Sequence, residues 1–225
     1  MKKIIAAIVM TVCMVSATFA LDFSIGARGN LGRNLSTDMK SSWSEIASTT
    51  METPFEFGFG AYTNFALLGG LGVQAELNLT KSKIQFNNSN ISNPDYQTYD
   101  YDTWLLDVPV MCWLNLDLWR ITVGFGAGVN FAFDLNAGSL SDVYEQTKAL
   151  VKENTFKMGF VCGADFKFYV TNNIGIVLDA RWIIDFQKKT ATYDTGTPIG
   201  GIDYPTIEFQ RNSFYAGLGL EFKFF

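Results

Sequence analysis

Histidine is absent from the 225 residues of this chain. It is the side chain best suited to general base catalysis near neutral pH and the commonest transition-metal ligand, so its absence excludes Ser/His and Cys/His enzymes. A carboxylate pair that activates water is the enzymatic alternative left open, and Asp95, Asp100 and Asp102 are acids that lie close together. No motif places them in such a pair. We therefore expect no catalytic residue, no metal site and no cofactor, and a protein that is not an enzyme.

Cysteine and basic residues are also scarce. Of three cysteines, Cys13 lies near the amino terminus, and two others in so long a chain are no disulfide framework. The chain has 17 basic against 22 acidic residues, a net charge of −5, and no basic run. This composition argues against a nucleic-acid partner, because binding to phosphates requires a basic surface.

Long hydrophobic runs are missing beyond residue 20, although 48% of the residues are hydrophobic. No later run reaches the roughly 20 residues of a transmembrane helix, which excludes a helical membrane protein. The first twenty residues have the pattern of a signal peptide, with Lys2 and Lys3 before an apolar stretch and a small residue, Ala20, at its end. We expect cleavage after Ala20, export of the chain, and a single domain over residues 21–225; a retained membrane anchor is the alternative.

Apolar residues alternate with other residues throughout that domain. This period of two is the period of a β-strand, and no stretch of similar length follows the 3.6-residue period of a helix. Eight segments carry the pattern, and none of their apolar-face positions is charged: 21–27, 55–65, 71–79, 104–114, 121–133, 156–170, 174–186 and 214–224. The sequence therefore predicts an all-β fold with eight strands.

The two faces of these strands differ in composition. Sixteen of the 20 phenylalanines lie on the apolar face, and twelve of the 20 glycines lie on the opposite face. Glycine weakens a strand exposed to water, but it suits a narrow interior that bulky groups from neighbouring strands must fill. We therefore expect the apolar face to meet lipid and the glycine-rich face to line the inside of a closed barrel. A secreted, lipocalin-like soluble barrel is the weaker alternative.

Short and long connections alternate between the segments. The short ones span 66–70, 115–120 and 171–173. The long polar ones span about 31–53, 81–98, 134–154 and 187–206. Both termini lie on the short side, as in barrels with short periplasmic turns and long extracellular loops. A short helix is expected in the third long loop, over residues 141–154, where Ser141 would cap it.

Two motifs resemble those of a known family. The chain ends with a glycine, two alternating aromatic residues and a final aromatic residue: Gly219, Phe222, Phe224 and Phe225. This pattern resembles the terminal assembly signal of outer-membrane barrels, and Leu105–Val110 resembles a Leu-Glu-Ile-Pro-Leu stretch common in their small members. Taken together, residues 21–225 resemble the small eight-stranded outer-membrane β-barrel family of the OmpA, OmpX and OmpW-like type.

The resemblance implies a fold, a location and partners. The implied fold is an eight-stranded antiparallel up-and-down transmembrane β-barrel with short periplasmic turns and long extracellular loops. The implied location is the outer membrane of a diderm bacterium. The implied partners are outer-membrane lipid, the barrel-assembly machinery through the C-terminal strand, and host or surface ligands at the loops.

Charged residues on the interior face are the candidate functional residues. They carry both signs: Arg28, Glu56, Glu76, Asp107, Lys157, Asp165, Lys167, Asp179, Arg181, Asp185, Glu221 and Lys223. Buried charges are tolerated when they are paired, and an eight-stranded barrel is just wide enough for side chains to fill. We expect a lumen plugged by paired charges, with Asp165 and Lys167 meeting Asp179, Arg181 and Asp185 on the next strand. An ion path lined by the same residues is the alternative.

Two function hypotheses follow from this interior. In the first, the barrel has a structural or surface-interaction role through its extracellular loops. In the second, it is a narrow porin-like channel or carrier for small solutes, and the lumen charges set its selectivity.

The strand assignment also places aromatic residues and thiols. Trp104, Trp113, Trp119 and Trp182 are expected in the aromatic girdles at the membrane interfaces, together with Tyr99 and Tyr101. The two cysteines of the mature chain, Cys112 and Cys162, fall on the lipid face with one strand between them. Strands two apart are separated by roughly 10 Å, which is beyond disulfide reach, so two free thiols are expected.

A barrel of this kind should migrate differently on gels with and without boiling, because the folded form resists detergent. We expect heat-modifiable migration and recovery of the protein from outer-membrane fractions. Recovery in the soluble periplasm would refute the barrel.

Overall fold

Ten β-strands make up the described part of the chain. The computed structural model describes residues 22–35, 39–41, 49–66, 70–88, 98–135, 156–192 and 206–224. The strands are β1 (Asp22–Asn34), β2 (Met39–Ser41), β3 (Thr49–Glu52), β4 (Phe55–Ala66), β5 (Leu71–Asn88), β6 (Thr98–Leu118), β7 (Ile121–Asp134), β8 (Phe156–Tyr169), β9 (Ile174–Thr192) and β10 (Thr206–Lys223). Within these residues, no helix has the length and apolar character needed to cross a bilayer. The expected signal peptide and the expected helix over 141–154 lie outside them.

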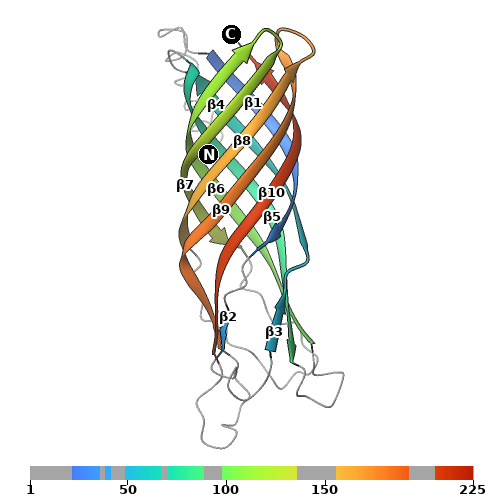
Figure 1. Cartoon of the computed structure of the whole chain (residues 1–225), viewed down its shortest axis with the longest axis vertical. Coiled ribbons are helices and arrows are strands. Elements are labelled where there is room, and N and C mark those ends of the chain that lie inside the picture. The colour runs from blue at the N-terminus through green and yellow to red at the C-terminus, as the bar shows by residue number, and fades with distance from the viewer. Residues whose placement is uncertain are drawn as a thin grey trace, which may run out of the picture.

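Eight of the ten strands close into a barrel. They follow the order β1-β4-β5-β6-β7-β8-β9-β10, and β10 pairs with β1 to complete the ring. This last pairing is antiparallel and runs from Ser24 opposite Lys223 to Asn34 opposite Ser213. Figure 1 shows the tilted strands, with the carboxyl terminus at the end that holds the short turns. The predicted eight-stranded antiparallel up-and-down barrel is confirmed.

The barrel is apolar outside and polar inside. On β4, the Phe59 side chain is 60% exposed, whereas Glu56 is 1% exposed and faces the interior. The other lipid-face phenylalanines and leucines follow the same alternation, and arginine, aspartate and glutamate occupy the inward positions. A soluble lipocalin-like barrel would have the opposite arrangement, with apolar side chains inside. The predicted orientation of the two faces is therefore confirmed.

Inward glycines make room for large interior side chains. A Cβ added to Gly126 would lie 2.6 Å from two ring carbons of Trp113, and one added to Gly217 would overlap the Asp179 carboxylate. Trp113 is itself 1% exposed, so its expected place in the lipid-facing girdle is wrong. The reason is its register: Cys112 and Leu114 point outward, so the residue between them points inward.

Several strands are longer than the alternation predicts. The β5–β6 pairing continues to Asn87 opposite Thr98, and the β9–β10 pairing to Thr192 opposite Thr206. Both hairpins therefore extend into the expected loops 81–98 and 187–206, whose predicted bounds are wrong. Outside lipid the outward face of a strand can be polar, so the apolar register ends before the strand does, as at Lys81 and Lys83 after Leu79.

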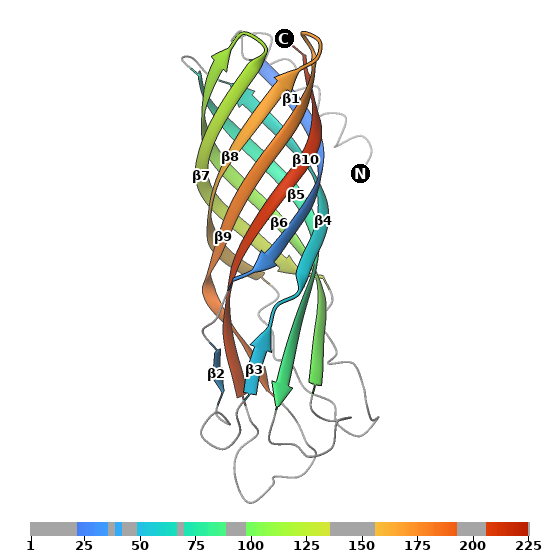
Figure 2. The ribbon, with the colours of Figure 1, turned by 45° about the vertical axis from the view of Figure 1, so that its right-hand side comes forward.

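The two short strands widen these hairpins. β3 pairs with β5, and β2 pairs with β10. Figure 1 and Figure 2 show both extensions beyond the barrel, at the end opposite the short turns. At the turn end, β6 continues to Leu118, so the expected turn 115–120 shrinks to Trp119 and Arg120. The two cysteines lie on the strands that neighbour β7. Cys112 on β6 and Cys162 on β8 both lie opposite Ala127 on β7, and they are free thiols, as predicted.

The inward glycines lead to a prediction about stability. Gly126→Ala forces a methyl group against the buried Trp113 ring and should lower the free energy of unfolding by about 1–3 kcal/mol. Gly29→Ala is the matched control, because a Cβ there meets no atom within 4 Å. Urea unfolding in lipid vesicles measures both variants. Equal stability of the two would show that the interior does not require glycine at Gly126.

Candidate functional site

A four-residue charge cluster crosses the middle of the lumen. Arg28 on β1 donates from Nη2 to Glu76 Oε2 on β5, and Arg181 on β9 donates from Nε and Nη2 to Glu76 Oε1 at 3.2 and 3.1 Å. Asp179 lies 2.6 Å from Arg28 Nη1 and 3.2 Å from Arg181 Nη1. Two guanidinium groups thus alternate with two carboxylates, and their charges balance.

Neutral neighbours hold this middle cluster in place. Gln74 Nε2 and Asn78 Nδ2 donate to the two oxygens of Glu76 at 2.7 and 3.0 Å. The Arg181 guanidinium carbon lies 4.7 Å from the Trp113 ring centroid, a distance suited to cation–π contact. Glu76 therefore accepts hydrogen bonds on both oxygens, which offsets much of the cost of burying its charge.

A second cluster crosses the lumen nearer the long loops. Arg211 on β10 donates from Nη1 and Nη2 to the two oxygens of Asp107 on β6, both at 2.7 Å. The same guanidinium donates to the Tyr215 hydroxyl at 2.9 Å. The Tyr215 hydroxyl donates to Glu56 Oε2 at 2.5 Å. Asn130 Nδ2 donates to Asp107 at 2.8 Å. Side chains from β4, β6, β7 and β10 are thus joined in one network.

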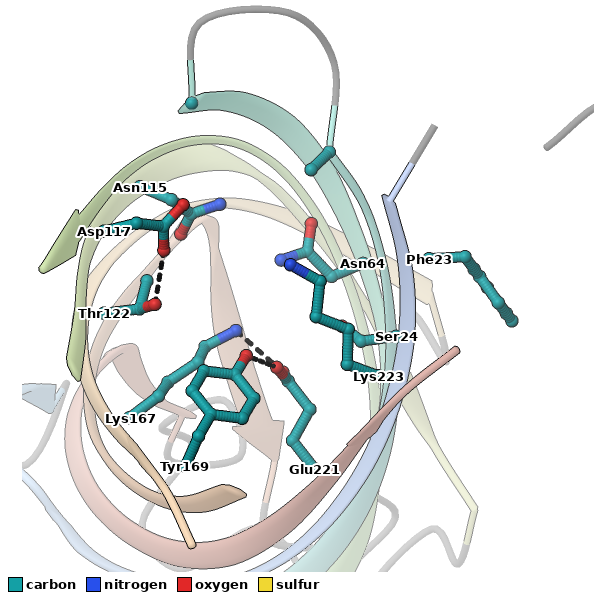
Figure 3. A pocket seen from close by; sticks show the side chains of 12 residues that line it. Phe23, Ser24, Asn64, Asn115, Asp117, Thr122, Lys167, Tyr169, Glu221 and Lys223 are labelled. Carbon is teal, nitrogen blue, oxygen red and sulfur yellow. Dashed lines mark hydrogen bonds and ion pairs between the residues drawn. The ribbon is translucent and has the colours of Figure 1, made fainter. Parts of the chain in front are cut away.

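A third cluster lies near the short turns. Lys167 Nζ donates to Glu221 Oε2 at 2.7 Å, and the Tyr169 hydroxyl donates to Glu221 Oε1 at 2.6 Å. Asp165 Oδ2 lies 3.7 Å from the same ammonium group. Figure 3 shows Lys167, Tyr169 and Glu221 converging on one side of the barrel mouth.

A polar cavity opens beside this third cluster, at the turn end. Its volume is about 90 Å³, and its lining includes Asn64, Asn115, Asp117, Thr122 and Lys223. The Thr122 hydroxyl donates to Asp117 across one side of it. We call this cavity the vestibule, and it lies beside the turn-side cluster.

The structure distributes the predicted lumen residues among these three clusters and the ends of the barrel. Glu56 and Asp107 lie in the loop-side cluster; Arg28, Glu76, Asp179 and Arg181 in the middle one; Asp165, Lys167 and Glu221 in the turn-side one. Lys157 pairs with Asp134 at 2.9 Å, and Lys223 lines the vestibule. Asp185 is buried, and its carbonyl accepts a hydrogen bond at 2.5 Å from Gln210 Nε2, the residue before Arg211.

The expected grouping of Asp165 and Lys167 with Asp179, Arg181 and Asp185 is found only in part. Lys167 makes its short contact with Glu221 on β10, and Arg181 reaches Glu76 across the lumen. The ion pairs inside the expected group are the Arg181–Asp179 contact within β9 and the long Lys167–Asp165 contact within β8. Adjacent position on the sheet does not decide pairing, because long side chains reach past their neighbours.

Sequence reasoning missed Arg211, Tyr215 and Trp113 as interior groups. Arg211 follows the inward register of Ser213 and Tyr215, but it lies between the expected loop 187–206 and the expected strand 214–224 and was assigned to neither. The structure places it on β10, next to an irregularity in the β9–β10 pairing. Continuing the alternation from Phe214 toward the amino terminus places Ser213 and then Arg211 inside the barrel. Tyr215 and Trp113 were missed because the candidate interior residues were chosen by charge alone.

Most carboxylates of the three clusters have polar partners. Glu76, Glu221, Asp107 and Glu56 accept hydrogen bonds from amide, ammonium, guanidinium or hydroxyl groups. Asp165 Oδ1 and both Asp179 oxygens are buried without a hydrogen-bond partner among the described residues. Among the described residues, no group of three or more cysteine, aspartate or glutamate side chains is arranged to hold a metal ion. The side chains of Asp100 and Asp102, and the whole of Asp95, lie outside the described part of the chain.

Comparison with known proteins gives the family and the fold. The profile described as "Outer membrane protein beta-barrel domain" matches residues 4–222. The outer membrane protein OprG from Pseudomonas aeruginosa superposes with a TM-score of 0.70 at 13% identity, over 90% of this chain and 95% of its own. A major outer membrane protein from Thermus thermophilus gives 0.54 at 12% identity, over 91% and 100%. No curated protein sequence matches.

The central position of Glu76 leads to a second stability prediction. Glu76→Gln keeps the side-chain size but leaves two buried guanidinium groups facing one carboxylate, and should lower the free energy of unfolding by about 3 kcal/mol or more. Adding Arg181→Gln restores the balance and should recover part of the loss. Lys188→Gln, at an exposed position on β9, is the control and should change stability by less than about 0.5 kcal/mol. Additive losses in the double variant would contradict a shared charge cluster.

Proposed function

The chain belongs to the outer membrane protein β-barrel domain family, and on this basis we propose that it is a closed barrel that acts at the cell surface. As a member of that family it is a protein of the outer membrane. The observation that supports closure is the set of buried ion pairs at three levels of the lumen. The proposed role is structural or surface-interacting, and it is not enzymatic.

Two of the charge clusters connect opposite walls of the barrel. In the closed ring, β6 and β10 are four strands apart, as are β5 and β9. Arg211 on β10 nevertheless reaches Asp107 on β6 at 2.7 Å, and Arg181 on β9 reaches Glu76 on β5 at 3.1 Å. Hydrogen bonds of this length across the diameter leave no room for a hydrated ion at those two levels. Opening the lumen would require both pairs to separate.

Surface interaction is supported by the two extended hairpins. The β7–β8 pairing stops at Phe133 opposite Phe156, whereas β5–β6 and β9–β10 continue well beyond the lipid-facing part. With β3 and β2 added, each hairpin becomes a small three-stranded sheet outside the barrel (Figure 2). We propose that host or other surface ligands are contacted there, since the end opposite the short turns faces the outside of the cell in this fold.

The C-terminal strand is the proposed contact with the barrel-assembly machinery. Phe222 and Phe224 are exposed on the lipid face, with ring centroids 4.9 Å apart, and Phe23 stacks on Phe224 at 5.3 Å. Gly219 lies opposite Arg28 in the β1–β10 pairing, and Phe225 lies outside the described residues. This aromatic group marks the seam where the last strand meets the first.

A narrow channel is the second candidate, and the vestibule is the observation that favours it. Asn64 Oδ1 and Asn115 Oδ1 line its walls as buried oxygens with no hydrogen-bond partner among the described residues. Such atoms are sites for ordered water. A hydrated entrance is what a channel requires, but the lumen beyond it would also have to open.

Single-channel recording in planar bilayers distinguishes the two candidates. The closed barrel should give a flat trace, and the variant Glu76→Ala with Arg181→Ala should also remain flat, because the Arg211–Asp107 pair still joins opposite walls of the lumen. Defined conductance steps from the unmodified protein would refute closure and support the channel. In that case Glu76→Gln should reduce selectivity for cations, since one negative charge leaves the path.

A further inference from the structure

The two-residue turn between β6 and β7 holds a strained and exposed tryptophan. Leu118 pairs with Ile121, so the turn consists of Trp119 and Arg120 alone. Trp119 has a φ of 59°, and among the described residues it is the sole non-glycine residue with positive φ. Its side chain is 94% exposed. Glycine suits this backbone better, and the indole packs against no core, so the fold itself does not explain the tryptophan.

Arg120 differs from the other four arginines of the described strands. Arg28, Arg181 and Arg211 contact buried carboxylates, and Arg33 donates to the Thr53 carbonyl at 2.8 Å. For the Arg120 guanidinium, the described part of the chain provides neither a carboxylate nor a hydrogen-bond acceptor. Its one side-chain contact there is the Trp119 ring, whose centroid lies 5.2 Å from the guanidinium carbon.

The turn is held rigidly at the edge of the apolar surface. The Tyr169 N–H at the end of β8 donates to the Arg120 carbonyl at 2.8 Å. Leu116 and Leu118 are exposed on the lipid face directly before the turn, so Trp119 follows the last apolar residues of β6. In this family's orientation the short turns face the periplasm. A turn that directly follows the last exposed apolar residues is expected where hydrocarbon meets the glycerol and phosphate groups of the inner leaflet.

We propose that Trp119 and Arg120 form a binding site for the headgroup of an anionic, phosphate-bearing glycerolipid in the inner leaflet. Tryptophan is favoured at the boundary between hydrocarbon and water, where the indole remains partly hydrated. A planar guanidinium can donate two parallel hydrogen bonds to one phosphate group, and contact with the indole ring orients the guanidinium for this. The positive charge of Arg120 supplies the complement to the phosphate. The site depends on residence in the membrane and not on whether the lumen is closed.

Lipid titration of the folded full-length protein tests this site. The protein is kept in maltoside micelles, which contain no phosphate, and short-chain phosphatidylglycerol is added while native mass spectrometry measures the bound fraction. Arg120→Gln should weaken binding roughly fivefold, the usual effect of one basic residue near an anionic lipid surface. Lys188→Gln removes an exposed charge near the opposite end of the barrel and should leave binding unchanged.

Trp119→Gly separates a lipid site from a structural role. Because the backbone at Trp119 suits glycine, this variant should unfold at the same or a higher urea concentration while binding less lipid. If Arg120→Gln does not fold, Arg120→Lys, which keeps the charge but loses the fork, should show an intermediate loss of binding.

Four outcomes would overturn the proposal. They are unchanged lipid binding in both Arg120→Gln and Trp119→Gly, an equal loss in Lys188→Gln, equal binding of a phosphate-free glycolipid, and displacement of the lipid by inorganic phosphate at the same concentration. The last result would assign the turn to free anions.

Discussion

Closure of the sheet is the constraint on which the rest of this structure depends. A strand in hydrocarbon has no water to bond its N–H and C=O groups, so every edge must be paired within the chain. The β1–β10 pairing satisfies the last two edges. Once eight strands are closed, the interior diameter is set, and it is just wide enough for side chains to fill. Inward glycines beside Trp113 and Asp179 are the direct result.

The interior of a barrel of this width is filled by the side chains of the inward register, because the apolar residues of the other register face lipid. Here the filling is charge, arranged so that the groups of the three clusters meet a partner of opposite sign or a polar neighbour. Glu76 and Arg181 meet from opposite walls, and so do Asp107 and Arg211. The cost of removing these groups from water is offset only when they are paired, which ties the stability of the barrel to the pairing of charges across its lumen.

The two ends of the barrel lie in different surroundings, and their structures differ accordingly. At one end, two hairpins continue as polar sheets beyond the lipid-facing surface. At the other, the chain turns within two residues, and Trp119 and Arg120 lie where apolar surface meets water. Length and polarity suit contacts with soluble partners, whereas a short rigid turn suits contact with the membrane boundary. The proposed surface role and the proposed lipid site therefore occupy opposite ends of one scaffold.

The amino-acid sequence by itself determined the number of barrel strands, the direction of each face and the presence of charges inside, because side chains alternate between lipid and lumen at every residue. It did not indicate the two short strands β2 and β3. It did not determine which charges meet. Arg181 bonds to Glu76, and Arg211, outside the expected strand, bonds to Asp107. Strand ends were also hidden where the lipid-facing register became polar, as at Lys81 and Lys83 on β5 after Leu79. Those outcomes depend on strand tilt and stagger around the closed ring, which bring distant walls together and leave no local trace in the sequence.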